Sequence, residues 1–200
     1  MIRRLLPVLA LGAWAVLAHA GGADSGPGGG ALAHGARDGD APAWAVTVDA
    51  PSGWIRDCCT YARAIGVDAV LYQGEWSGKP QRVIVLNVTS RKLTNLADEV
   101  QADRRRYRQL DPAAKLTPLT VRHRTMPCQA TTYQGSDHID DVVVLCDPGK
   151  ASGVRLSWSV SFDDGDPSRC ALLDDFMRVV LTSRYLRDVP PATHASAHGG

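Results

Sequence analysis

The segment from Arg82 to Thr89 constrains the fold of this chain most, because it is apolar on both faces. Residues 83–86 read Val-Ile-Val-Leu, and successive side chains of a strand point to opposite faces of a sheet. A strand that is apolar on both faces lies inside a sheet that is covered on both sides. We therefore expect Arg82–Thr89 to be a central strand.

A second segment, Val154–Phe162, alternates between apolar and polar residues. Its apolar side chains are expected to face the core, and Ser157, Ser159 and Ser161 to face solvent. The same reading predicts further strands at Ala43–Asp49, Val67–Gln73, Leu119–Arg124, Cys128–Gln134 and Asp141–Asp147.

Helices are expected between these strands. Asp57 can cap a short helix over Cys58–Ile65, and Thr94 or Asn95 can cap a longer one that ends near Leu110. Asp166 and Pro167 mark the start of a last amphipathic helix. The order of elements predicts an α+β fold, with a mostly antiparallel central sheet of about six to seven strands and two longer helices and one short helix packed on it.

The first twenty residues have the organisation of a secretory signal peptide. Arg3 and Arg4 precede an apolar stretch, and Ala18-His19-Ala20 has the small-x-small pattern of a cleavage site. The apolar stretch is shorter than the about 20 residues that a membrane span needs. We expect residues 1–20 to be removed, the protein to be exported to the periplasm or secreted, and no transmembrane span to remain.

Composition divides the rest of the chain. Residues 21–42 are Gly-rich and are expected to be a flexible leader, and residues 190–200 a disordered tail. Residues 43–189 are expected to form one α+β domain. The formal net charge of +1 includes Arg3 and Arg4, so the exported chain is near neutral. A near-neutral chain lacks the charge that binds nucleic acid or an anionic membrane.

The cysteines of an exported protein are expected to form disulfides. Cys128 and Cys146 lie at equal distances from a turn near Asp137, so a hairpin would place them opposite each other and allow a bond. Cys170 is expected to pair with Cys58 or Cys59. Alternatively, Cys58-Cys59 could form a vicinal disulfide with redox activity, or a soft-metal site, although no further ligand lies nearby in the sequence.

Several of these features together resemble the PsbP/Mog1-like superfamily, as it occurs in small exported bacterial proteins. The resemblance rests on the Pro51-x-Gly53-Trp54 turn followed by Asp57, on the segment Ala64–Tyr72, and on the order of the later elements. It implies a central antiparallel sheet with helices against its faces, in proteins that are mostly non-enzymatic assembly or binding factors. The adjacent cysteines at 58 and 59 depart from that family's pattern.

No segment has the spacing of a catalytic site. His123 and His138, the histidines inside the expected domain, do not lie in a nucleophile-elbow or papain-like context. We expect no enzyme, no cofactor and no metal, but an exported binding or assembly domain of the bacterial cell envelope whose partner is an unknown protein or small ligand. The alternative is a thiol redox or soft-metal-handling protein that uses Cys58-Cys59. Candidate contact residues are Trp54, Trp76, Arg104, Arg105 and Arg108.

Overall fold

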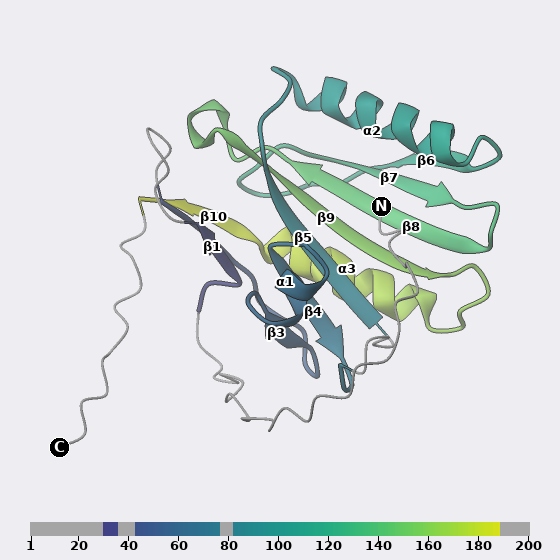
Figure 1. The fold of residues 1–200 in the computed structure, drawn as a ribbon, viewed down its shortest axis with the longest axis horizontal. Helices are drawn as coiled ribbons and strands as arrows, with labels where there is room; N and C mark the ends of the chain where they lie inside the picture. Colours follow the sequence, from purple (N-terminus) through teal and green to yellow (C-terminus); the bar gives the residue numbers. More distant parts are fainter. Residues whose placement is uncertain (1–29, 36–42, 77–81, 189–200) are drawn as a thin grey trace, which may run out of the picture.

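The protein is built on a seven-stranded antiparallel sheet with the order β3-β4-β5-β9-β8-β7-β6 (Figure 1). The structure is a computed structural model and describes residues 30–35, 43–76 and 82–188. The strands are β3 (Ile55–Asp57), β4 (Ala69–Gln73), β5 (Arg82–Ser90), β6 (Lys115–Leu119), β7 (Cys128–Gln134), β8 (Ile139–Cys146) and β9 (Val154–Asp163). The expected α+β fold is confirmed. The expected signal peptide and tail lie outside the described residues.

Strand β5 is an interior strand, as its two-faced apolar pattern predicts. It is hydrogen-bonded to β4 on one side and to β9 on the other. Ile84 and Leu86 point to one side of the sheet and are buried together with Trp158 of β9, so this side is called the apolar face. Val85 points to the opposite side, where its register partner is Ser159. This side is called the polar face.

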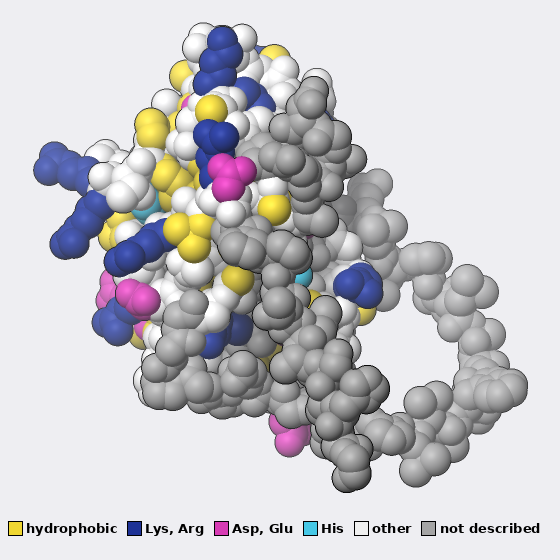
Figure 2. All heavy atoms as spheres, turned by 90° about the vertical axis from the view of Figure 1, so that its left-hand side faces the viewer, with side chains coloured by type: hydrophobic (Ala, Val, Ile, Leu, Met, Phe, Trp, Pro, Cys, Tyr) yellow, Lys and Arg dark blue, Asp and Glu magenta, His cyan; other side chains and the backbone are white. Residues whose placement is uncertain are grey.

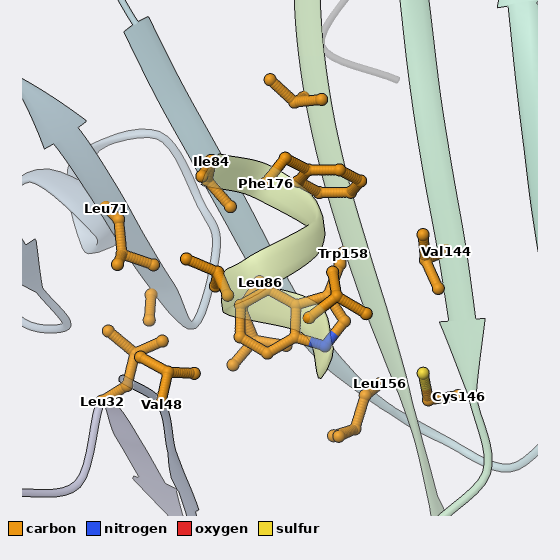
Figure 3. Packing of buried hydrophobic residues seen from close by; sticks show 14 of the residues in the cluster. Leu32, Val48, Leu71, Ile84, Leu86, Val144, Cys146, Leu156, Trp158 and Phe176 are labelled. Atoms are coloured by element: carbon orange, nitrogen blue, oxygen red, sulfur yellow. The ribbon is translucent and has the colours of Figure 1, made fainter. Parts of the chain in front are cut away.

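Helix α3 (Arg169–Thr182) covers the apolar face. Phe176 is fully buried and packs with Trp158 in the core (Figure 3), while Leu172, Val179 and Val180 complete the helix's buried stripe. Burying an aliphatic or aromatic side chain of this kind contributes about 1.5–3 kcal/mol. In Figure 1, α3 lies behind β5.

Two other helices pack on the polar face. Helix α2 (Leu96–Leu110) lies against β7 and β8, and the short helix α1 (Tyr61–Ala64) lies against β4. Asn95 is the N-cap of α2, and Asp98 and Glu99 lie in its first turn, where acidic side chains favour the helix dipole. The part of the polar face that β5 and β9 form lies between these two helices.

A separate three-stranded sheet has the order β1-β2-β10, with β1 (Ala33–Gly35), β2 (Trp44–Thr47) and β10 (Arg184–Arg187). Strand β10 was not expected from the sequence. Strand β1 falls inside the expected flexible leader, so that expectation was wrong for residues 30–35. Leu32 is buried in the main core, and its amide donates to the Val46 carbonyl at 2.7 Å. The buried side chains of Leu32 and Ala33 and the pairing of β1 with β2 hold this segment against the fold.

Three local boundaries also differ from the sequence expectation. The strand expected at Leu119–Arg124 lies earlier, as β6, where Pro118 is tolerated because β6 is an edge strand. Helix α1 is shorter than expected, and Asp57 Oδ1 accepts from the amides of Tyr61 and Ala62 at 2.7 and 2.8 Å. Helix α3 begins after Ser168, whose amide donates to Asp166 Oδ1 at 2.7 Å.

The hairpin of β7 and β8 contains the disulfide that the sequence predicts. Cys128 and Cys146 are register partners, their Cα atoms are 4.2 Å apart, and their sulfurs are bonded. The Cys146 side chain is fully buried at the apolar face. The bond links adjacent strands near one end of the hairpin.

Removing this bond is expected to destabilise the protein. Replacing Cys128 and Cys146 together by Ser should lower the free energy of unfolding in urea by about 3 kcal/mol, because the unfolded chain gains freedom. The control is Cys170→Ser, which alters an exposed free thiol and should stay within about 0.5 kcal/mol of the wild type. Equal urea midpoints for the double variant and the wild type would contradict the prediction.

Candidate functional site

A groove of about 400 Å³ lies on the polar face, beside α2 and over β5, β9 and β8. Its volume lies within the range of about 300–1,000 Å³ that small-molecule sites occupy. The lining comes from three sheet strands, from α2 and from the loop that joins β5 to α2. The groove is therefore built from segments that are far apart in the sequence.

The floor of the groove combines polar side chains with the apolar Val143 and Leu145 of β8. Asn87 and Thr89 come from β5, and Ser157 and Ser159 come from β9. Asn87 and Ser157 are register partners, so these side chains are neighbours across the two strands. The sequence pattern predicts that the serines face solvent, and the structure places Ser157 and Ser159 half-buried under the groove.

The α2 wall of the groove is held to the sheet by tyrosines. Tyr107 is buried and donates its hydroxyl to Asp141 Oδ2 of β8 at 3.0 Å. Tyr133 of β7 stacks on Tyr107 with ring centroids 4.2 Å apart and donates its hydroxyl to Asp103. Burial, together with the Asp103 carboxylate, raises the pKa of Tyr133, so it remains a donor.

An arginine on β9 fixes the end of the groove at which α2 begins. The Arg155 side chain is almost fully buried; its Nε lies 3.1 Å from Glu99 Oε2 of α2 and its Nη1 lies 2.7 Å from Asp147 Oδ1. Its Nη2 donates to the carbonyls of Leu93 and Thr94, both at 3.4 Å. Removing one partner of such a buried ion pair costs about 3–5 kcal/mol. Arg155 therefore ties α2 and the preceding loop to the sheet.

The aromatic residues predicted as contacts lie away from the groove. Trp54 is buried, and its indole Nε1 donates to Asp175 of α3 at 2.8 Å, so its ring is not available as the surface contact that was expected. The reason is long-range: the turn before β3 folds under α3. Trp76 is half-buried and stacks on Tyr61, with ring centroids 4.7 Å apart.

The predicted arginines lie on α2 but do not line the groove. The half-buried Arg104 donates from Nε to Thr131 Oγ1 of β7 at 2.9 Å, and Arg105 and Arg108 are exposed. Arg106, between them in sequence, does line the groove, as does Lys92 of the preceding loop. The sequence signal for Arg106 was its position three residues after Asp103 on one side of the helix.

The cysteines at 58 and 59 are bonded to each other. Cys170 is a free, exposed thiol, so the expected pairing of Cys170 with Cys58 or Cys59 was wrong. The tight turn between β3 and α1 brings the adjacent sulfurs together, and each sulfur can form only one such bond. Cys58 packs against the main core and Cys59 is exposed. Within the described ranges, no group of three or more His, Cys, Asp or Glu could hold a metal ion.

His123 has a structural role at another surface. Its Nδ1 accepts from the amides of Thr125 and Met126, both at 3.1 Å, so its Nε2 carries the proton and donates to the Ser183 carbonyl at 3.1 Å. Burial lowers the pKa of His123, which favours this neutral form. Arg122 and Arg124, which flank His123, are exposed. Figure 2 shows Lys and Arg side chains spread over one face of the molecule, among hydrophobic and acidic ones.

The second histidine, His138, lies at the surface beside an acidic residue. His138 is exposed and lies 2.9 Å from Asp164 Oδ2, and this hydrogen bond raises its pKa. Among the described residues, no helix is long and apolar enough to cross a membrane.

The comparisons with known proteins concern the fold alone. No family model and no curated protein matches the chain. The structure is similar to the solution structure of cyanobacterial PsbP (CyanoP) from Synechocystis sp. PCC 6803, with 14% identity, a TM-score of 0.45, and 82% of this chain and 100% of that chain covered. It is also similar to a mutant of the protein Mog1, with 14% identity, a TM-score of 0.46, and 70% of this chain and 89% of that chain covered. Both similar structures are of proteins, PsbP and Mog1, that the sequence resemblance also names.

Proposed function

We propose that this protein is an exported, non-enzymatic binding domain of the bacterial cell envelope, and that it holds a small ligand in the groove on the polar face. The observation that carries the proposal is the groove itself, a hollow of about 400 Å³ whose lining combines apolar side chains with hydroxyl and amide groups on the floor. Concave sites with a few converging polar groups are the usual places where proteins bind small molecules.

The walls of the groove are fixed before any ligand binds. Tyr107 holds α2 to Asp141, and Arg155 holds the start of α2 through Glu99. A site that is ordered in advance loses less conformational entropy on binding, which favours affinity. This arrangement supports a binding role for the polar face.

The chemistry of the groove supports binding rather than catalysis. Hydrolysis by a serine requires a general base within hydrogen-bond reach of the hydroxyl. Among the described residues that line the groove there is no histidine, and Asp103 and Asp141 accept hydrogen bonds from tyrosines. The floor serines Ser157 and Ser159 make no side-chain hydrogen bond to these carboxylates.

Filling the groove is expected to abolish binding without unfolding the protein. Ser159→Trp places an indole on the floor, beside Val85 and Val143, where strands accept aromatic residues. The wild type, incubated with a small-molecule extract of envelope fractions, should retain a ligand by native mass spectrometry, and the variant should not. The control is Thr117→Trp on the exposed edge strand β6. The proposal fails if the wild type retains nothing or if Ser159→Trp binds equally.

The proposal of export rests on residues 1–20 and on the bonded cysteines, since disulfides persist in oxidising compartments. The protein recovered from periplasm or medium should begin at Gly21 by N-terminal sequencing. Replacing Ala18 and Ala20 by Asp should block cleavage, because the peptidase requires small residues there. Full-length protein that remains in the cytoplasm would contradict export.

The bonded pair Cys58-Cys59 is the observation that favours a second function, thiol redox exchange. An external dithiol would reduce this disulfide to two thiols and would itself become a disulfide. Cys59 is exposed, so an attacking thiolate can reach it.

Thiol counting distinguishes the two functions. If the groove is the functional site, native protein in a glutathione buffer should titrate one thiol, the exposed Cys170, and Cys170→Ser should titrate none. Two additional thiols that disappear in the Cys58→Ser/Cys59→Ser variant would instead favour redox exchange. Labelling with mass-spectrometric mapping identifies which cysteines react.

A further inference from the structure

The acidic side chains that line the groove already have partners. Glu99 forms an ion pair with Arg155 and also accepts from the Leu93 amide at 3.1 Å. Asp103 accepts from the Tyr133 hydroxyl. Asp141 accepts hydrogen bonds from the hydroxyls of Tyr107 and Ser161. Each carboxylate that lines the groove is therefore already engaged by a side chain or an amide of the protein.

The basic side chains that line the groove have no such partners. Within residues 30–35, 43–76 and 82–188, neither Lys92 nor Arg106 makes an ion pair or a side-chain hydrogen bond. Asp103, three residues before Arg106 on the same side of α2, is engaged by Tyr133 instead. Arg91, next to Lys92, pairs with Asp147, so Lys92 alone of these two remains unpaired.

The floor also presents hydrogen-bond donors. Thr89, Ser157 and Ser159 each carry a hydroxyl, and Asn87 carries an amide NH₂. In the described parts of the chain, none of these four side chains hydrogen-bonds to another protein group. The unengaged groups of the groove are thus two cations and four neutral groups that can donate.

We infer that the ligand of the groove carries an oxyanion, a carboxylate or a phosphate, which Lys92 and Arg106 bind while the hydroxyls and the amide of the floor contact its polar body. Guanidinium and ammonium groups bind both kinds of oxyanion through short, charge-assisted hydrogen bonds. The inference rests on the proposed function, because it names the chemistry of the ligand in that same groove.

The test uses small probes and the full mature protein. Inorganic phosphate and acetate are titrated separately into ¹⁵N-labelled protein, and sorbitol serves as an uncharged probe. Either anion should shift the amide resonances of Lys92, Ser157 and Ser159, and added NaCl should weaken its binding. The anion that binds more tightly shows whether the groove prefers a phosphate or a carboxylate.

Matched variants show whether the two cations are responsible. Lys92→Gln and Arg106→Gln should each weaken binding of the better anion about tenfold, since a hydrogen bond to a charged group is lost. Arg105→Gln, on the exposed side of the same helix, should leave binding unchanged. All three positions are exposed, so unchanged thermal midpoints are expected to confirm folding.

Each outcome has a definite meaning. The inference is overturned if neither anion shifts the groove resonances, or if Arg105→Gln weakens binding as much as Arg106→Gln. If sorbitol shifts those resonances and the anions do not, the inference of an oxyanion ligand is wrong, while the proposal that the groove binds a small molecule stands. If Ser159→Trp also retains the natural ligand, the proposed function fails as well.

Discussion

The arrangement of the polar face depends on the buried guanidinium of Arg155. This side chain joins β9 to Glu99 of α2, to Asp147 after β8, and to the carbonyls of the loop before α2. A buried cation is tolerated only where opposite charge lies close to it, and Glu99 and Asp147 supply that charge here. Together with the Tyr107–Asp141 hydrogen bond, this network holds α2 over β7 and β8 and leaves β5 and β9 open beside it.

The two faces of the sheet differ because α3 covers the apolar face, whereas α2 and α1 leave part of the polar face open. On the apolar face, α3 packs on β9 and completes the main core around Trp158. On the polar face, α2 and α1 pack toward opposite edges of the sheet and leave a groove over β5, β9 and β8. The apolar face therefore accounts for stability and the polar face for the proposed binding. The vicinal Cys58-Cys59 bond lies in the β3–α1 connection, outside the residues that line the groove.

Much of the fold could be predicted because its signals are local. The alternation of Val154–Phe162, the two-faced run of β5 and the equal spacing of Cys128 and Cys146 about one turn were enough to place these elements and a disulfide. The site could not be predicted in the same way. The alternating pattern predicts only that Ser157 and Ser159 lie on the solvent-facing side of their strand. The position of α2 makes them part of the floor of a groove.

The sequence by itself determined the α+β class, the central place of β5 and the hairpin disulfide, because periodicity and turn spacing are properties of neighbouring residues. The tertiary structure alone decided that Leu32 is ordered, that Trp54 is buried against α3, and that Cys58 bonds to Cys59 while Cys170 stays free. It also decided which cations lack partners. These outcomes depend on contacts between residues far apart in the chain, and burial and charge pairing are set by the partner that packing supplies.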